Sequence, residues 1–328
     1  MILAGDIGAT NSRLGFFKVE AKRLIAVVED IFPSGKHRTL DEIVAAFVSR
    51  HALAVEHACF GVPGPIRKGR AEPVNLPWII DQPQLAAILG LKTVEMINDL
   101  EANAYGVSAL EPHDFLILNQ GAPDAAGNAA VIAAGTGLGE AGLYWDGTDH
   151  RPFATEGGHA DFAPRNALEV KLLLYLESQF TYVSWERLVS GPGLFNIYKF
   201  LCDSQSLEEP RWLAEAIREH DASAVISENA LEGRSELCVQ ALEMFVSLYG
   251  SEAGNLALKF LATGGVFIGG GIAPKIVEKL KGPIFMTAFT SKGRLRPLLE
   301  ATPVRVILND RAALLGAARC AALRGGLL

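Results

Sequence analysis

Cysteine is scarce in this sequence, and long hydrophobic runs are missing. The four cysteines, Cys59, Cys202, Cys238 and Cys320, lie far apart, and no C-x-x-C pair occurs. This spacing argues against a thiolate zinc site and is typical of free thiols in a reducing compartment. The most apolar stretch, Phe260–Ala273, is shorter than the roughly 20 residues needed to span a bilayer and is interrupted by glycine. We therefore expect no membrane partner.

A secretory leader and an excess of positive charge are also missing. Residues Met1–Asp6 contain neither a basic segment nor a long apolar core, so we expect a cytoplasmic protein. The sequence has 30 Lys and Arg against 37 Asp and Glu, which gives a formal net charge of −7 at pH 7. Because neutralising phosphates along a nucleic acid requires a basic surface, we expect no nucleic-acid partner.

The sequence does contain enough apolar material to bury substantial cores. Of its 328 residues, 49% are hydrophobic and 20% are charged, a composition that excludes intrinsic disorder. At roughly 100–200 residues per domain, the length allows one large domain or, better, two. The 33 glycines indicate loops in which the backbone approaches a ligand closely.

Hydrophobic periodicity and turn residues predict an α/β chain. Residues 1–19 read as a β-hairpin that turns at Gly5–Asn11. Further strands are expected at residues 58–62, 93–97, 131–134, 141–145, 266–268 and 304–308. Helices are expected at residues 40–52, 83–89, 100–109, 167–180, 185–189, 194–201, 210–219, 236–260, 274–280 and 311–323. Turn residues within 111–127 indicate a domain boundary.

Residues 131–145 repeat the pattern of the first hairpin. Placing Gly8 over Gly137 lays Leu14 over Leu143, so that an apolar strand, a glycine-rich turn and a second apolar strand correspond. Hairpins are common, and this match alone is explained equally well by chance and by an internal repeat.

The first glycine turn places a carboxylate beside backbone amides. In Gly5-Asp6-Ile7-Gly8-Ala9-Thr10-Asn11, Asp6 ends a strand and the turn follows at once. Backbone N–H groups in such a turn can hold phosphate oxygens, and Thr10 adds a hydroxyl donor. Asp6 would repel phosphate, so we interpret it as an anchor for hydrated Mg²⁺, which favours one or two carboxylates plus water. A plain hairpin with Asp6 as a turn residue is the alternative.

Two further glycine turns follow later in the chain. Gly135-Thr136-Gly137-Leu138-Gly139-Glu140 fails as a dinucleotide motif, because Glu140 replaces the third glycine and a strand follows instead of a helix. It is better read as a second phosphate-contacting hairpin. In Gly264–Pro274 a buried strand ends in three glycines, where the bare backbone could admit a base and a ribose, or simply form a tight packing turn.

Polar side chains suited to a polyol stand at three places. Asn98-Asp99 follows a strand and opens a helix, which suits an N-cap or a carboxylate that accepts a hydroxyl proton during phosphoryl transfer. Glu156 and His159 flank a Gly-Gly turn, and Glu186 stands at a helix start. Such groups can bind sugar hydroxyls, although solvated loop residues would look the same.

These segments occur in a recognisable order. They are residues 5–11 (GDIGATN), 97–99 (IND), 134–139 (AGTGLG), 156–164 (EGGHADFAP), 186–194 (ERLVSGPGL) and 264–272 (GGVFIGGGI). Together they resemble the proteobacterial-type family of bacterial glucokinases, within the actin/hexokinase/chaperone-ATPase superfamily. The resemblance covers nearly the whole chain; blocks 156–164 and 186–194 are specific to the family, whereas the glycine turns are shared across the superfamily.

The resemblance implies a fold and an activity. The fold is α/β, with two ribonuclease H-like domains of the actin/hexokinase type and an interdomain active-site cleft. The small domain would comprise residues 1–109 plus about 300–328, and the large domain residues 110–299. The activity is ATP-dependent phosphorylation of D-glucose to glucose 6-phosphate, the first step of glycolysis. The family uses ATP and Mg²⁺ as cofactors, binds glucose and forms homodimers.

The resemblance also assigns roles to individual residues. Asp99 matches the catalytic base, and Asp6 would bind Mg²⁺ through water. The residues that match glucose ligands are Asn98, Asp99, Glu156, His159 and Glu186. The residues that match the ATP site are Gly5, Asp6, Ile7, Gly8, Ala9, Thr10, Gly135, Thr136, Gly137, Gly265, Gly269, Gly270 and Gly271.

One departure and two competing functions bear on this reading. Many kinases of the repressor/kinase group carry a Cys-rich zinc motif after the residue that matches His159, and here residues 161–166 contain no cysteine, which disfavours that group.

A kinase for another hexose, such as fructose or an amino sugar, is the nearest alternative. A non-catalytic nucleotide-binding or regulatory protein is the other, and the presence of Asp6 and Asp99 argues against it.

Overall fold

The computed structural model describes residues 1–73, 76–204 and 209–328, which form two compact units. The first unit comprises Met1–Asp114, His150–Ala154 and Asn309–Leu328, and the second comprises Phe115–Asp149 and Thr155–Leu308. The first unit is therefore completed by a segment that follows the whole second unit in the chain.

The first unit is built on a five-stranded sheet with the order β3-β2-β1-β4-β7. Its strands are β1 (Ile2–Ile7), β2 (Asn11–Glu20), β3 (Arg23–Pro33), β4 (His57–Val62) and β7 (Glu95–Asn98). β1 and β2 form the expected hairpin, whereas β1, β4 and β7 run parallel. The hairpin and the strands expected at 58–62 and 93–97 are confirmed; β3 was not expected.

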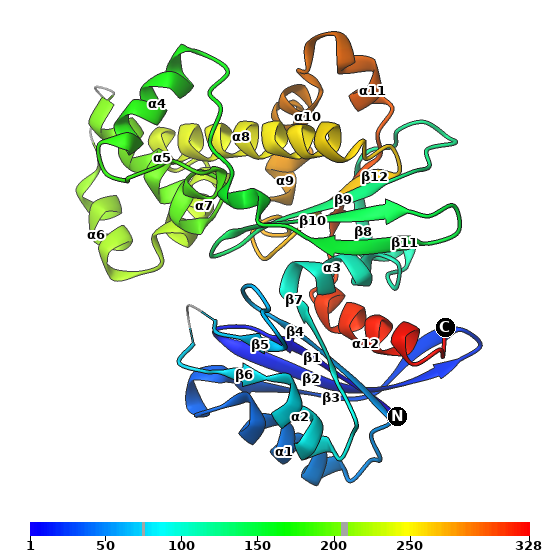
Figure 1. The fold of residues 1–328 in the computed structure, drawn as a ribbon. Helices are drawn as coiled ribbons and strands as arrows, with labels where there is room; N and C mark the ends of the chain where they lie inside the picture. The colour runs from blue at the N-terminus through cyan, green and yellow to red at the C-terminus, as the bar shows by residue number, and fades with distance from the viewer. Residues whose placement is uncertain (74–75, 205–208) are drawn as a thin grey trace. The chain divides into compact units, whose positions relative to one another are not determined.

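Helices cover both faces of this sheet (Figure 1). They are α1 (Leu40–His51), α2 (Gln82–Leu89), α3 (Asp99–Val107) and α12 (Ala312–Arg324); the unit also contains the short pair β5 (Arg70–Ala71) and β6 (Ile80–Asp81) and the 3₁₀ turns η1 (Ser34–Lys36) and η2 (Pro112–Asp114). Side chains alternate along β1, so that Leu3 packs in the cluster of α1 and α2, whereas Ile2 and Ala4 pack in the cluster of α12.

The second unit is built on a mixed sheet with the order β11-β10-β9-β12-β13-β8, of which the edge strand β11 is the segment counted with the first unit. Its strands are β8 (Phe115–Asn119), β9 (Ala129–Ala134), β10 (Leu138–Trp145), β11 (His150–Ala154), β12 (Gly265–Gly269) and β13 (Val304–Ile307). β9 and β10 form an antiparallel hairpin, and β9, β12 and β13 run parallel. The first sheet has the same arrangement of a hairpin beside two parallel strands, which favours the internal repeat over chance.

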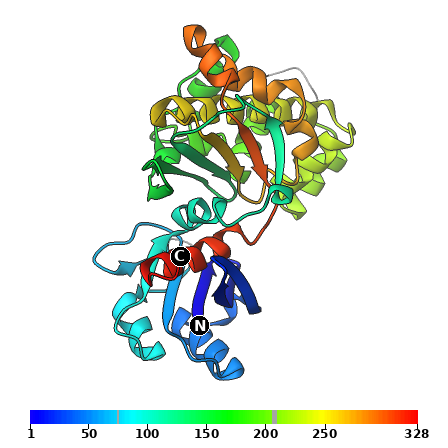
Figure 2. The same cartoon turned by 90° about the vertical axis from the view of Figure 1, so that its right-hand side faces the viewer.

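One face of the second sheet is covered by helices, with α8 (Glu236–Phe260) along its centre (Figure 2). The other helices are α4 (Ala167–Glu177), α5 (Gly191–Ser204), α6 (Arg211–Glu219), α7 (Ala222–Leu231), α9 (Val277–Leu280), α10 (Pro283–Thr290) and α11 (Arg296–Glu300), with 3₁₀ turns η3 (Gly157–His159), η4 (Trp185–Arg187) and η5 (Gly293–Leu295). Phe245 and Tyr249 of α8 and Ile132 and Ile268 of the sheet share one core. The expected bounds of α8 are confirmed, with Ser235 as its N-cap.

The helices expected at 100–109 and 167–180 end two and three residues early, and two others differ more from the prediction. Residues 274–280 were expected to be helical, but only Val277–Leu280 is, and the chain before it forms turns. The N–H groups of Lys275 and Ile276 both donate to the Ile272 carbonyl, so this stretch forms successive turns before the regular helix begins. The segment expected as a helix at 185–189 is the 3₁₀ turn Trp185–Arg187, held by Val183 and Trp185 pairing with Phe162 and Ala160.

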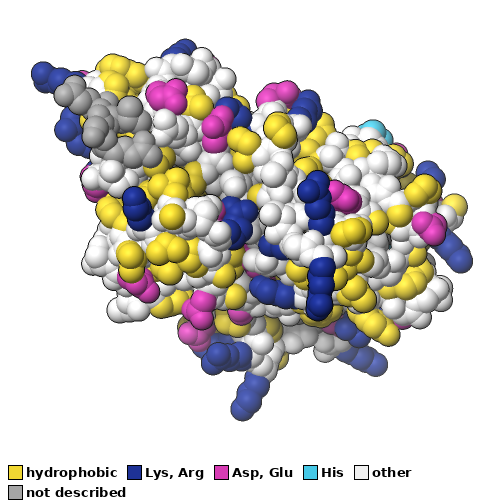
Figure 3. Space-filling view, turned by 90° about the horizontal axis from the view of Figure 1, so that it is seen from above, with side chains coloured by type: hydrophobic (Ala, Val, Ile, Leu, Met, Phe, Trp, Pro, Cys, Tyr) yellow, Lys and Arg dark blue, Asp and Glu magenta, His cyan; other side chains and the backbone are white. Residues whose placement is uncertain are grey.

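No helix among the described residues is long and apolar enough to cross a membrane. On the face shown in Figure 3, Lys and Arg side chains stand singly or in small groups among hydrophobic and acidic ones. All four cysteines are free thiols, and Cys59, Cys238 and Cys320 are buried.

Candidate active site

The first glycine turn joins β1 to β2 and is braced by Ser34. The Gly8 N–H donates to the Asn11 carbonyl at 3.0 Å, the Ser34 hydroxyl donates to the Gly8 carbonyl at 2.7 Å, and the Ser34 N–H donates to the Thr10 carbonyl at 2.9 Å. The exposed N–H groups of Ala9 and Thr10 have no acceptor within residues 1–73, 76–204 and 209–328. A rigid turn with two outward amides is suited to bind an anion.

Asp6, at the end of β1, belongs to an acidic cluster around Arg13. Asp6 and Arg13 are cross-strand partners, and the Arg13 guanidinium donates to the Asp310 carboxylate at 2.9 Å. Burial, followed by the neighbouring charge of Asp99, raises the pKa of Asp6 to about 6, while Arg13 opposes that shift. The hydrogen bond from Arg13 lowers the pKa of Asp310.

The Asp6 carboxylate fits a cation held through water. It forms no hydrogen bond or ion pair within the described part of the chain, and two further carboxylates, Asp99 and Asp310, act on it electrostatically. No cluster of three or more His, Cys, Asp or Glu suited to enclose a metal is found among the residues described. A magnesium ion bound by one carboxylate, water and substrate phosphates needs no such cluster.

Asn98 and Asp99 stand where β7 passes into α3. Asn98 is the N-cap of the helix: its Oδ1 accepts the Leu100 N–H at 2.9 Å, and its Nδ2 donates to the Gly64 carbonyl at 3.3 Å. The capping interpretation is thus confirmed, and one amide N–H is left for a ligand. β1, β4 and β7 are parallel and Asp6 lies opposite Gly61, so Asp6 and Asp99 share the carboxyl edge of the sheet, where ligands of α/β proteins bind.

The second glycine turn lies between β9 and β10. The Gly135 N–H donates to the Gly137 carbonyl, and the Gly191 N–H at the start of α5 donates to the Gly135 carbonyl, both at 2.8 Å. The N–H groups of Thr136 and Gly137 have no acceptor in the described portion of the chain. This turn repeats the first in having two consecutive amides available to an anion.

The third glycine turn lies beside the second. Gly270 has a φ of +82°, and a Cβ there would collide with the Ala134 carbonyl, so the position requires glycine. The Ile272 N–H donates to the Ala134 carbonyl at 3.2 Å. Beneath both turns, the buried Tyr249 hydroxyl accepts the Ala134 N–H at 3.2 Å and lies 3.3 Å from the Gly269 carbonyl. Residues 135–137 and 269–271 are therefore brought together at one end of the sheet.

The three polar residues expected to bind a sugar in the second unit gather around the start of β10. Glu186 accepts the Leu138 N–H at 3.0 Å, while Gly158, between Glu156 and His159, packs against the Leu138 carbonyl. Tyr182 lies 3.4 Å from the Nδ1 atom of His159. The Glu156 and His159 side chains are exposed and Glu186 is partly buried.

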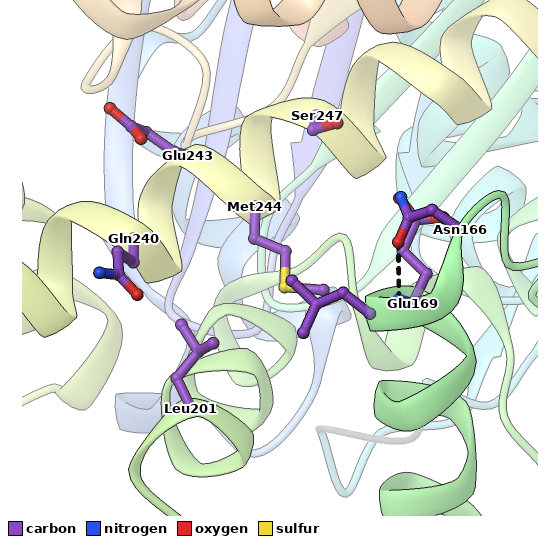
Figure 4. Close-up of a pocket in the computed structure, with 8 residues that line it drawn as sticks. Asn166, Glu169, Leu201, Gln240, Glu243, Met244 and Ser247 are labelled. Atoms are coloured by element: carbon purple, nitrogen blue, oxygen red, sulfur yellow. Dashed lines mark hydrogen bonds between the residues drawn. The ribbon is translucent and has the colours of Figure 1, made fainter. Parts of the chain in front are cut away.

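A separate pocket of about 300 Å³ lies between α4, α5 and α8 (Figure 4). Asn166, Glu169, Leu201 and Met244 are among its lining residues, and none of its lining residues is a predicted site residue. The Asn166 Oδ1 accepts the Glu169 N–H at 3.0 Å, so this corner of the pocket is organised by the N-cap of α4. Its lining offers no constellation suited to phosphoryl transfer.

Sequence reasoning missed the residues that support the predicted ones. Arg13 could have been found from the hairpin register, which places it opposite Asp6. Ser34 and Asp310 are distant in sequence from their partners, Gly8 and Arg13, and carry no local signal. The sequence predicts Tyr249 only as part of the helix at residues 236–260. In the structure its hydroxyl contacts Ala134 and Gly269, which precede the two glycine turns of the second unit.

Comparison with known proteins identifies close relatives. A family model described as Glucokinase matches residues 3–324. The glucokinase of Nostoc punctiforme is 42% identical, with 98% of this chain and 99% of that protein covered. The glucokinase of Hahella chejuensis is 34% identical, with 96% of this chain and 95% of that protein covered.

Solved structures share the α/β fold with its mixed sheets. The crystal structure of a glucokinase from an Antarctic psychrotroph has a TM-score of 0.86 at 32% identity, and covers 98% of both chains. A ROK family glucokinase from Streptomyces griseus, solved with glucose and AMPPNP, has a TM-score of 0.65 at 22% identity, covering 98% of this chain and 99% of that one. The second likeness shows the fold alone.

Proposed function

The chain belongs to the glucokinase family, and from this premise we propose that it transfers the γ-phosphoryl group of ATP to the 6-hydroxyl of D-glucose. The products are glucose 6-phosphate and ADP. The observation that carries the proposal is the family match over residues 3–324, since it includes Asp99 and every glycine turn described above.

We propose that the two compact units are two ribonuclease H-like domains of the actin/hexokinase type, with the active site in a cleft between them. The shared arrangement of each sheet, a hairpin beside two parallel strands, supports this reading. The domains expected from sequence, residues 1–109 plus about 300–328 and residues 110–299, resemble the compact units in having the C-terminal segment return to the first.

The glycine turns would hold the nucleotide. Gly5–Thr10 and Gly135–Gly137 offer consecutive backbone amides to phosphate oxygens, and Gly265 with Gly269–Gly271 leaves bare backbone for the adenosine. Asp6 would hold Mg²⁺ through water, and the bound ion would supply charge that offsets the negative charge of the phosphates. Because the protein carries a net charge of −7 and no Walker lysine, these local donors provide the positive field that an anionic ligand needs.

The sugar would be held by groups that both donate and accept hydrogen bonds. Asn98, Asp99, Glu156, His159 and Glu186 bind the hydroxyls, and Asp99 orients the 6-hydroxyl. As the bond from the sugar oxygen to the γ-phosphorus forms, the bond from that phosphorus to the β-phosphate oxygen breaks, and the hydroxyl proton passes to the Asp99 carboxylate. The transfer is largely dissociative, so positioning and charge balance supply most of the catalysis.

A panel of hexoses with coupled detection of ADP tests the proposed function. Glucose should give the highest kcat/KM with MgATP, and mannose, fructose and glucosamine much lower values. A higher value for another sugar would assign the chain to that hexose, and nucleotide binding without sugar-stimulated ADP release would identify a non-catalytic protein. Replacing ATP by polyphosphate in the same assay tests the donor.

We propose further that the protein acts in the cytoplasm as a homodimer. The family resemblance supports the dimer, and the low cysteine content with four free thiols supports a reducing compartment. Sedimentation velocity at micromolar concentration should give the mass of two 35.1 kDa chains; a single-chain mass would contradict the dimer.

A further inference from the structure

A buried glutamate lies beneath the proposed sugar-binding segment. Glu140, on β10, is only 1% exposed, and its Oε1 atom has no hydrogen-bond partner among the residues that the structure describes. A buried ionised carboxylate with an empty acceptor is unfavourable, whereas a protonated one can donate a hydrogen bond and carries no charge. The surroundings of Glu140 therefore favour its neutral form.

The groups that act on Glu140 come from α8. Glu252, which is fully buried, opposes ionisation of Glu140 by its charge and by hydrogen bonding, whereas Lys259 favours it, and the hydroxyl of Tyr249 also senses its charge. Burial and Glu252 together raise the pKa of Glu140 to about 8. Burial raises the pKa of both carboxyls, so the pair favours holding a proton.

The partners of Glu252 explain why it is the ionised member of the pair. Glu252 accepts from Lys259 at 3.0 Å and from Asn255 at 2.7 Å, and Asn255 in turn accepts from Lys292. Burial lowers the pKa of Lys292 to about 8, so this amine also loses its proton as the medium becomes alkaline. Glu140 has no comparable cationic partner of its own.

The Glu140 side chain and backbone both touch the sugar-binding segment. Its Oε2 atom lies against Gly157, in the space that a Cβ would occupy, so a side chain at residue 157 would displace the Glu140 carboxyl group. The Glu140 carbonyl accepts from the Thr155 hydroxyl at 2.9 Å, and that hydroxyl accepts the Gly157 N–H at 3.1 Å. Glu156 lies between the two residues of the segment that contact Glu140, Thr155 and Gly157, and His159 follows two residues later.

We propose that Glu140 is a positioning residue whose neutral carboxyl group holds the Glu156–His159 segment in its glucose-binding conformation, so that loss of the proton weakens glucose binding. This inference rests on the proposed function. Ionisation would put two like charges side by side and leave an unpaired charge against Gly157, and the exposed segment above is the part of the surroundings that can move to admit water.

The sign of the pH effect follows from the raised pKa. Glu140 is neutral below about pH 8 and ionised above it, so glucose binding should be strong near pH 7 and decline as pH rises through that value. Calorimetry of glucose binding without ATP should show Kd increasing by roughly three- to tenfold between pH 7 and 9. In steady-state assays KM for glucose should follow Kd, while kcat changes less.

Two variants test whether Glu140 is the group that titrates. Glu140→Gln mimics the neutral carboxyl and should give a Kd that is flat from pH 7 to 9. Glu252→Gln removes the charge that opposes ionisation of Glu140, so the loss of glucose affinity should begin at a lower pH. This variant provides a second test if thermal unfolding shows that Glu140→Gln does not fold. Glu243→Gln, an equal change of charge elsewhere on α8, should keep the wild-type profile.

The outcomes separate this inference from the proposed function. If the wild-type enzyme phosphorylates glucose but its Kd for glucose is independent of pH, only the role of Glu140 is overturned. The same holds if the Glu140→Gln variant loses glucose affinity between pH 7 and 9 as the wild type does. A wild-type protein that neither binds glucose nor forms ADP overturns the proposed function itself.

Discussion

Asp99 is the residue on which the proposed phosphoryl transfer depends most directly. It lies at the carboxyl edge of the first sheet, near the Asp6 carboxylate, and Asn98 rather than Asp99 provides the main cap of α3. Replacing it with asparagine should preserve the local fold and remove only the proton acceptor.

The variant Asp99→Asn should lose about 10²- to 10⁴-fold in kcat, the usual contribution of a general base. Its affinity for glucose should change by roughly fivefold or less, since the amide can still hydrogen-bond the 6-hydroxyl. Rapid-quench turnover and calorimetry measure the two effects separately. Asp81→Asn, a cap substitution at the start of α2, is the control; near-normal turnover of Asp99→Asn would remove the base from the mechanism.

The role of Asp6 is tested by its dependence on magnesium. Asp6→Asn keeps the size of the side chain and removes the charge, so kcat/KM for MgATP should fall about a hundredfold and half-saturating Mg²⁺ should rise about tenfold. Titration of activity with Mg²⁺ at fixed ATP gives both numbers. Asp30→Asn, on β3 of the same sheet and paired with Arg50, should behave as wild type. An unchanged Mg²⁺ requirement in Asp6→Asn contradicts the assignment.

At the scale of single elements, Asn98 combines two tasks that substitution can separate. Asn98→Ala removes the cap of α3 and should lower the free energy of unfolding by about 0.5–2 kcal/mol. Asn98→Asp keeps the capping oxygen but has no N–H for the Gly64 carbonyl or for a sugar, so its stability should fall less than that of Asn98→Ala, while glucose affinity falls roughly 5- to 150-fold. Asn166→Asp, the same change at the cap of α4, is the control. If Asn98→Asp binds glucose normally, the residue is a cap only.

The connection between α8 and the two glycine turns depends on one hydroxyl. Tyr249→Phe leaves the packing of the ring intact but removes the partner of the Ala134 N–H, and should cost about 1–3 kcal/mol in urea unfolding. Because both turns are proposed to contact ATP, KM for ATP should rise more than KM for glucose. Tyr198→Phe, which loses a hydroxyl bonded to Glu209, provides the comparison; equal effects of the two variants on KM for ATP would show that Tyr249 has no particular link to the turns.

Elements with strong periodicity or turn chemistry could be predicted from the sequence, whereas those defined by tertiary contacts could not. α1 and α8 combine helical apolar spacing with the N-caps Thr39 and Ser235. The β1–β2 hairpin combines two apolar strands with a glycine turn. β3 was missed because its outer residues, such as Val27 and Ile31, are exposed apolar side chains that break the alternation expected of a strand. α7 and α10 are short, with 10 and 8 residues, and neither has a regular alternation of apolar and polar faces, so packing on α8 rather than local preference forms them.

The candidate site divides in the same way. Some members could be proposed from the sequence because their residue types suit phosphate and sugar ligands: the glycine turns, Asn98, Asp99, Glu156, His159 and Glu186. Ser34, Asp310 and Glu140 act through contacts with residues distant in sequence, namely Gly8, Arg13 and Gly157, and these contacts are visible only in the structure.

At the scale of the whole molecule, the proposed glucose ligands are shared between the two units. Asn98 and Asp99 belong to the first, and Glu156, His159 and Glu186 to the second. Saturating glucose should therefore slow backbone hydrogen exchange in both units, by up to about a hundredfold at a hundred times Kd where exchange requires global opening. Peptides covering residues 98–107 and 156–160 report this by mass spectrometry. A hexose rejected in the substrate panel is the control, and protection confined to one unit would contradict a shared site.

The return of α12 to the first unit has a consequence for biosynthesis. Ala317, Ala318 and Ala321 of this helix fill the core beside Ile2 and Ala4, so the hydrophobic face of β1 stays uncovered until translation has passed residue 324. The N-terminal strand that leaves the ribosome first is thus among the last to be fully buried, while the second unit, whose segments 115–149 and 155–308 both precede α12, can fold during synthesis. A nascent chain stalled before α12 would expose β1 to chaperones. Truncation before α12 should therefore destabilise the first unit, at the N-terminus, more than the second unit that directly precedes the truncated segment.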